Sequence, residues 1–138
     1  MKVIVTENLD DAYSQAANKI CNHVADKNTK SIGFATGSTM VPVYSRLIEN
    51  LRNYNLLNIK TFNLDEYIGL ASENPHSYAY YMHENLFSKL NFHPSNINLL
   101  DGKASNIKKE AEKYEARISC AGGIDLQLLG VGRNGHIG

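Results

Sequence analysis

The sequence predicts a three-layer α/β fold, in which a mostly parallel, Rossmann-like sheet is flanked by helices and is truncated at its carboxyl end. Short apolar runs alternate along the chain with segments of helical periodicity. The helical segments are long enough to carry the chain back across a sheet, which favours right-handed crossovers between parallel strands. Neither a low-complexity linker nor an internal repeat interrupts the 138 residues, so we predict one α/β domain over residues 1–138.

The first half of the chain predicts three strands and two helices. Residues 2–6 (KVIVT) form an apolar, β-branched run typical of a strand, and residues 9–26 then repeat apolar side chains at helical spacing. Residues 31–36 (SIGFAT) follow a polar turn and predict a second strand. An apolar stripe predicts a helix over roughly 39–53, and residues 59–64 (IKTFNL) predict the third strand.

The second half continues the alternation. Residues 76–90 predict a helix whose inward stripe begins at Tyr78. After a His-Pro-Ser turn, residues 97–100 (INLL) predict a short strand, and residues 105–120 predict a charged helix. Residues 124–131 (IDLQLLGV) predict a closing strand, and an apolar face of that strand is expected to be exposed.

Charge and composition exclude several classes of protein. The 14 Lys and Arg residues balance 14 Asp and Glu residues, so the chain lacks the excess of cations that nucleic acids and anionic membranes require. The unbroken apolar runs are far shorter than the roughly 20 residues that span a bilayer. The first residues lack a signal-peptide core, which favours a cytoplasmic protein. Cys21 and Cys120 lie far apart and outside any Cys/His cluster, so we predict two reduced thiols and no metal site.

A candidate phosphate-binding loop follows the second predicted strand. It consists of Thr36, Gly37, Ser38 and Thr39, directly before a predicted helix. Glycine lets the backbone approach a ligand, while the helix start offers unpaired N–H groups and the hydroxyls are further donors. The loop lacks the Gly-Lys-Ser/Thr of a nucleoside-triphosphate-binding loop, which excludes the class of NTPases. The alternative is an ordinary helix cap made by Ser38 or Thr39.

Two adjacent carboxylates, Asp65 and Glu66, follow the third predicted strand in the segment Phe-Asn-Leu-Asp-Glu-Tyr. Because neighbouring residues of an extended chain point to opposite sides, we expect one of the two to face a cleft. An ionised Asp can act there as a general base. The alternative is a pair of solvated loop acids or a helix cap.

The last polar motif is Gly-Val-Gly-Arg-Asn-Gly-His over residues 130–136. Its G-x-G-x-x-G spacing resembles a dinucleotide fingerprint, but the motif ends the last strand instead of opening the first βα unit, so we reject that reading. His136, with Asn134 beside it, can shuttle protons near neutral pH. The alternative is a loop histidine without a role.

The three motifs are predicted to meet, because parallel strands bring their carboxyl ends to one edge of the sheet. A phosphate-binding loop, a carboxylate base and a histidine at that edge indicate proton-transfer chemistry on a small phosphorylated metabolite.

At these residues the sequence resembles the glucosamine-6-phosphate deaminase (isomerase) family. The resemblance runs from residue 1 to residue 138 and rests on Ala-Thr-Gly-Ser-Thr at 35–39, on Thr-Phe-Asn-Leu-Asp-Glu-Tyr-Ile-Gly-Leu at 61–70, and on the Gly-Val-Gly-x-Asn-Gly-His-Ile motif. It implies conversion of glucosamine 6-phosphate and water to fructose 6-phosphate and ammonia, without a metal or an organic cofactor. It also implies that Asp65 is the base of enolisation, that His136 acts in ring opening and that Asn134 assists.

The resemblance also implies that the chain is incomplete. In the family the last motif continues into Phe-Asn-Glu-Pro, whose Glu joins the histidine in ring opening, and phosphate-binding cations follow later. We therefore expect this chain alone to be inactive or nearly so, and marginally stable. The family includes monomers and hexamers, so a homo-oligomer is possible. The competing interpretations are a 6-phosphogluconolactonase-like hydrolase, which is expected to carry Asp-Glu-Arg in place of Asp-Glu-Tyr, and a non-catalytic sugar-phosphate sensor.

Overall fold

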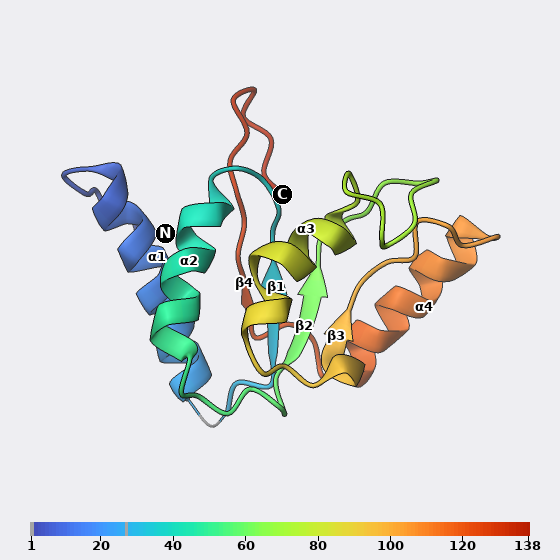
Figure 1. Ribbon diagram of the computed structural model, residues 1–138, viewed down its shortest axis with the longest axis horizontal. Helices are drawn as coiled ribbons and strands as arrows, with labels where there is room; N and C mark the ends of the chain where they lie inside the picture. Colours follow the sequence, from blue (N-terminus) through green and yellow to red (C-terminus); the bar gives the residue numbers. More distant parts are fainter. Residues whose placement is uncertain (1, 27) are drawn as a thin grey trace.

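A computed structural model describes residues 2–26 and 28–138, and Figure 1 shows their arrangement. Four strands form a parallel sheet in the order β3-β2-β1-β4, with β1 at Ser31–Phe34, β2 at Lys60–Asn63, β3 at Ile97–Asn98 and β4 at Leu126–Gln127. The described residues also form helices α1 (Leu9–Ala25), α2 (Met40–Leu51), α3 (Tyr78–Asn85) and α4 (Ile107–Cys120), and the short turns η1 (Phe87–Lys89) and η2 (Pro94–Asn96). The predicted parallel α/β fold is confirmed.

Helices cover both faces of the sheet, which gives the three predicted layers. On one face Ile32 and Phe34 of β1 belong to a buried core that α1, α2 and α3 complete. On the other face the ring of Phe62 in β2 meets the ring of Tyr114 in α4 edge to face, with the centroids 6.0 Å apart. The N–H of Asn63 donates to the Tyr114 hydroxyl over 2.8 Å, so α4 is attached to the end of β2.

Residues 2–6 do not form a strand, and this prediction is wrong. Val3, Ile4 and Val5 are 70%, 55% and 89% exposed. A strand needs backbone partners as well as residues of high β propensity. The sheet of the described residues has the order β3-β2-β1-β4, and the apolar run pairs with none of these strands, so its side chains stay exposed.

The last predicted strand, 124–131, is far shorter than expected. Beyond β4 the N–H of Leu128 still donates to the Gly33 carbonyl over 2.9 Å. The chain then leaves the sheet and forms a loop closed by an antiparallel bridge between Val131 and Ile137. The exposure expected along this segment holds for Leu129 and Val131, at 46% and 75%, whereas Leu128 packs against the core.

The predicted helices agree with the structure, except that the helix predicted over 76–90 ends early. α3 stops at Asn85 because Leu86 takes a non-helical conformation with φ −143°, and η1 follows. The start of α3 is fixed by Ser77, whose side chain accepts the N–H of Tyr80 over 3.0 Å. This N-cap makes Tyr78 the first residue of α3.

Candidate functional site

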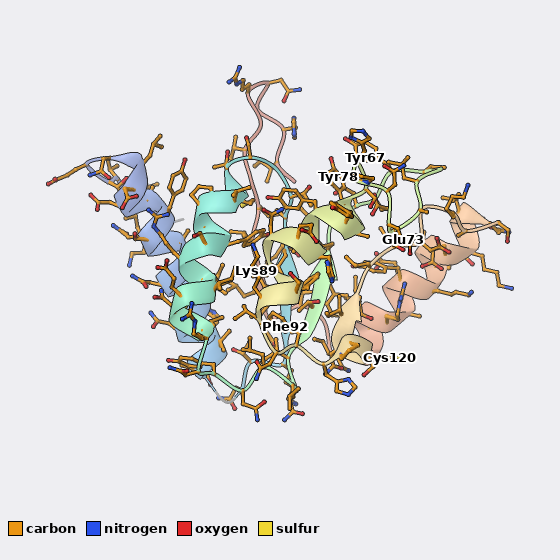
Figure 2. The ribbon with its side chains drawn as sticks, in the orientation of Figure 1. Tyr67, Glu73, Tyr78, Lys89, Phe92 and Cys120 are labelled. Carbon is orange, nitrogen blue, oxygen red and sulfur yellow. The ribbon has the colours of Figure 1, made fainter. Side chains whose placement is uncertain are left out.

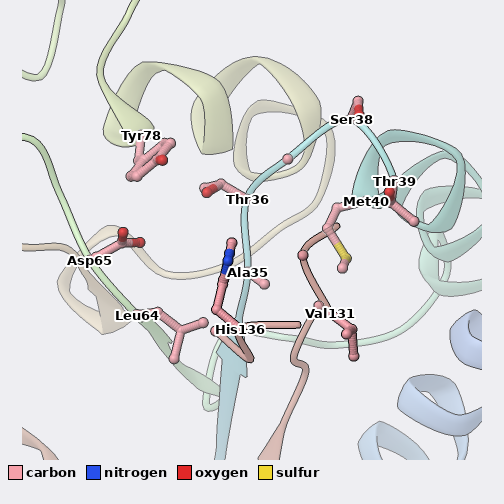
Figure 3. Close-up of a pocket in the computed structure, with 14 residues that line it drawn as sticks. Ala35, Thr36, Ser38, Thr39, Met40, Leu64, Asp65, Tyr78, Val131 and His136 are labelled. Atoms are coloured by element: carbon pink, nitrogen blue, oxygen red, sulfur yellow. The ribbon is translucent and has the colours of Figure 1, made fainter. Parts of the chain in front are cut away.

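The loops that follow β1, β2 and β4 meet in a cleft of about 340 Å³ at the carboxyl ends of the strands (Figure 3). The structure therefore brings the three predicted motifs together. The cleft is lined by Ala35, Thr36, Gly37, Ser38, Thr39, Met40, Leu64, Asp65, Tyr78, Gly130, Val131, Gly132, His136 and Gly138.

Two tyrosine hydroxyls hold the carbonyl groups of the loop after β1. The buried hydroxyl of Tyr44 donates to the Ala35 carbonyl, and that of Tyr81 donates to the Gly37 carbonyl over 2.8 Å. Gly37 has φ +116°, a conformation that favours glycine. The main-chain oxygens at 35 and 37 are thus already bonded to protein groups, which keeps these acceptors from an incoming anion.

The hydroxyls of Ser38 and Thr39 in this loop are available to a ligand. Thr39 is the residue that precedes α2, but its side chain makes no capping hydrogen bond. Within the described residues no side-chain hydrogen bond is found for Ser38 either, so the helix-cap alternative is not what the structure contains. Ser38 and Thr39 are both exposed and both line the cleft, next to the start of α2. Hydroxyls and a helix start in this arrangement suit a phosphate group.

Asp65 and Glu66 point to different surroundings, as expected for neighbours in an extended segment. Asp65 lines the cleft, and its pKa is raised, first by partial burial and second by the charge of Glu66. Glu66 turns away and accepts the N–H groups of Tyr78 and Ala79, at 2.9 and 2.8 Å, at the first turn of α3. Asp65 is therefore the carboxylate free to act on a ligand, and its raised pKa makes it a stronger base.

Tyr78 lines the cleft too, and sequence reasoning missed it. Its ring stacks on Tyr67 with the centroids 4.7 Å apart, and the two hydroxyls are 3.1 Å apart (Figure 2). The hydrogen bond to Tyr67 and then burial raise the pKa of Tyr78 to about 12. Helical periodicity assigned Tyr78 to the inward stripe. Ser77, a residue type that often caps helices, was the sequence feature that could have placed Tyr78 at the start of the helix.

His136 lines the cleft from the loop after β4, and Asn134 holds it from behind. The Asn134 side-chain oxygen accepts the backbone N–H of His136 over 3.3 Å and also contacts Nδ1 of its ring. An amide oxygen can only accept, so this contact favours a proton on Nδ1 and leaves Nε2 as an acceptor. Asn134 is not among the lining residues, so the structure gives it a position next to the histidine, not in the cleft.

The glycine at 132 makes room for this imidazole. A Cβ on Gly132 would lie 2.2 Å from Cε1 of His136. Any other residue at this position would push the ring aside. Gly132 of the motif is therefore explained by its close packing against His136 as well as by loop geometry.

Two structural findings bear on other site classes. The described residues contain no group of three or more His, Cys, Asp or Glu side chains placed to hold a metal ion. Over the same part of the chain, no helix has the length and apolar content needed to cross a membrane.

Comparison with known proteins finds relatives that match along the whole chain. A family model described as glucosamine-6-phosphate isomerases/6-phosphogluconolactonase matches residues 6–138. The chain is 47% identical over 140 residues to a glucosamine-6-phosphate deaminase from Clostridium botulinum strain Langeland, and 43% identical to one from Clostridium acetobutylicum. These matches cover all of this chain but only 57% and 58% of the relatives, so the chain spans a little over half of their length.

Two solved structures extend the comparison. A monomeric glucosamine-6-phosphate deaminase superposes with a TM-score of 0.95 at 37% identity, over 99% of this chain and 58% of that one. A 6-phosphogluconolactonase from Thermotoga maritima superposes with a TM-score of 0.79 at 26% identity, over 99% and 61%. The fold is thus similar to that of both proteins.

Proposed function

Since the chain belongs to the family of glucosamine-6-phosphate isomerases and 6-phosphogluconolactonases, we propose that it supplies much of the site of an enzyme that converts glucosamine 6-phosphate and water to fructose 6-phosphate and ammonia. The observation that carries this proposal is the cleft itself. It brings a carboxylate, a histidine and a hydroxyl-bearing loop at a helix start within reach of one small ligand. The identity to named deaminases supports the choice of reaction.

The loop at 36–39 binds the phosphate in this proposal. The backbone at Gly37 and the hydroxyls of Ser38 and Thr39 lie beside the start of α2, where partial positive charge favours an anion. Anchoring the phosphate there fixes the rest of the sugar along the cleft, toward the loops after β2 and β4.

His136 opens the sugar ring. Ring opening moves a proton from the C1 hydroxyl to the ring oxygen, and an imidazole with an unprotonated ring nitrogen can accept and return that proton. The Asn134 contact at Nδ1 leaves Nε2 free to take the proton first. Asn134 thus acts by setting the tautomer and orientation of the ring.

Asp65 then moves a proton between two carbons. In the open chain the C2–H bond is acidified by the neighbouring C1 aldehyde, so a carboxylate can remove its proton. Return of that proton to C1, together with transfer of a proton from the amine nitrogen to the C1 oxygen, converts the amino aldose to a ketose imine. Water adds to the imine carbon and ammonia leaves, which balances the reaction without a metal or a cofactor. The raised pKa of Asp65 suits it to this role.

A substrate panel tests this proposal. Because the chain spans a little over half of its relatives, the assay uses a protein in which the segment beyond this chain is supplied from the monomeric deaminase that it superposes on. We expect release of ammonia and fructose 6-phosphate from glucosamine 6-phosphate, and no acceleration of 6-phosphogluconolactone hydrolysis. Hydrolysis of the lactone without deamination would replace the proposal with the lactonase function. Binding of glucosamine 6-phosphate without any product would favour a sensor.

A further inference from the structure

We propose that Tyr78 is a substrate-contacting residue, whose phenol hydroxyl donates a hydrogen bond to a sugar oxygen next to the C1–C2 bond. This inference rests on the proposed function and adds a residue to it. Tyr78 lines the cleft together with Asp65 and Thr36. In Figure 3 Tyr78 and Asp65 lie to the left of Thr36, and Ser38 and Thr39 lie to its right, farther along the loop after β1. With phosphate on the Ser38 side, Tyr78 faces the sugar carbons on which Asp65 acts.

The backbone of Tyr78 is fixed by Glu66. Oε1 of Glu66 accepts the N–H of Tyr78 over 2.9 Å and also that of Tyr67 over 2.8 Å, while Oε2 accepts the N–H of Ala79 over 2.8 Å. The Glu66 carboxylate thus joins the first turn of α3 to Tyr67, the next residue in the chain. The backbones that carry Asp65 and Tyr78 are therefore fixed relative to each other, as contact of both side chains with one ligand requires.

The hydroxyl of Tyr78 is oriented by Tyr67. In this structure Tyr78 donates to the Tyr67 oxygen over 3.1 Å. Rotation of the two phenolic protons reverses this bond, so that Tyr67 donates to Tyr78 and Tyr78 donates to the ligand. Tyr67 is half exposed and its hydroxyl makes no other hydrogen bond within the described residues, so its proton is available for this reversal. Chains of hydroxyls of this kind strengthen one another.

A neutral donor fits this position better than a cation would. A Lys or Arg beside Asp65 would lower the pKa of the carboxylate and weaken it as a base. The pKa of Tyr78 is about 12, so the phenol keeps its proton throughout the neutral range and can only donate or accept a hydrogen bond. Tyr78 can thus bind or polarise a sugar oxygen while Asp65 stays basic.

The test uses the protein completed with the segment from the monomeric deaminase, in an Asp65→Asn background that prevents turnover, and compares it with the same protein carrying Tyr78→Phe. Phenylalanine keeps the ring that stacks on Tyr67 and removes the hydroxyl alone. Isothermal titration calorimetry gives the dissociation constants of glucosamine 6-phosphate and of inorganic phosphate. We expect Tyr78→Phe to weaken binding of the sugar phosphate roughly 5- to 30-fold, because one hydrogen bond to the ligand is lost. Binding of inorganic phosphate should change less than about twofold. Tyr80→Phe is the matched control, since Tyr80 lies on the same helix but lines a different groove.

The outcomes separate the two proposals. Equal weakening of both ligands would mean that the hydroxyl only supports the loop, and would overturn the role of Tyr78. Unchanged binding of glucosamine 6-phosphate to Tyr78→Phe, with binding by the completed parent protein, would overturn that role and leave the proposed function standing. Failure of the completed protein to bind glucosamine 6-phosphate would overturn the proposed function and, with it, the role of Tyr78.

Discussion

Replacing Tyr44 with phenylalanine tests what holds the phosphate-binding loop in place. Tyr44 is fully buried, its ring meets that of Phe34 edge to face at 5.8 Å, and its hydroxyl donates to the Ala35 carbonyl. The substitution keeps the ring and leaves the carbonyl of Ala35, a residue only 4% exposed, without this donor. A buried polar group that loses its partner costs about 1–3 kcal/mol. The folded-to-unfolded ratio should therefore fall roughly 5- to 150-fold.

Urea unfolding followed by far-UV circular dichroism measures this loss. With a denaturant slope of about 2 kcal/mol per molar, the midpoint should move down by roughly 0.5–1.5 M while the slope is unchanged. Tyr54→Phe is the matched control, because Tyr54 is 41% exposed and its hydroxyl has no partner within the described residues. That control should stay within about 0.5 kcal/mol of the wild type. A Tyr44→Phe midpoint equal to that of the control would refute the reasoning that this hydroxyl holds the loop.

Two further substitutions test the loop after β2. Asp65→Asn should stabilise the chain at pH 7, because burial and the Glu66 charge raise the pKa of Asp65 in the fold and so disfavour its ionised form. The gain in stability should vanish below about pH 4, where the carboxyl is protonated in both the folded and the unfolded state. Urea unfolding at pH 7 and below pH 4 measures this difference. A variant less stable than the wild type at pH 7 would contradict the predicted direction. Gly102→Ala should destabilise by about 1–3 kcal/mol, because its Cβ would lie 2.3 Å from the Tyr67 carbonyl oxygen and 2.6 Å from that of Leu70. Since both atoms are backbone, the turn must move, and an unchanged thermal midpoint would disprove the clash.

The sequence predicts helices well where an apolar stripe repeats over several turns, and it predicts strands poorly because strand formation depends on pairing with another segment. α1 and α2 begin and end within about two residues of their predicted bounds, because an apolar stripe over several turns is a local property. Residues 2–6 have a high β propensity but form no strand, because pairing depends on what lies next to them in space. β4 is cut to two residues for a related reason, since the glycine-rich segment after it bridges to itself at Val131 and Ile137.

The candidate site could be predicted in outline for a topological reason. Parallel strands end on one edge, so the Ser38, Asp65 and His136 motifs had to meet once the sheet was parallel. The supporting contacts could not be predicted in this way. Glu66 binds the first turn of α3, and Tyr78 enters the cleft, only because α3 packs at a particular place over the sheet.

The most direct test of the proposed mechanism is the turnover of glucosamine 6-phosphate by the protein completed to the length of its relatives, with Asp65 intact and with Asp65→Asn. The control is Glu112→Gln, which removes an exposed carboxylate from α4. If Asp65 is the base, formation of fructose 6-phosphate should fall at least about 100-fold in Asp65→Asn, while inorganic phosphate still binds and Glu112→Gln keeps full activity. Turnover by Asp65→Asn at the rate of the control would contradict the mechanism.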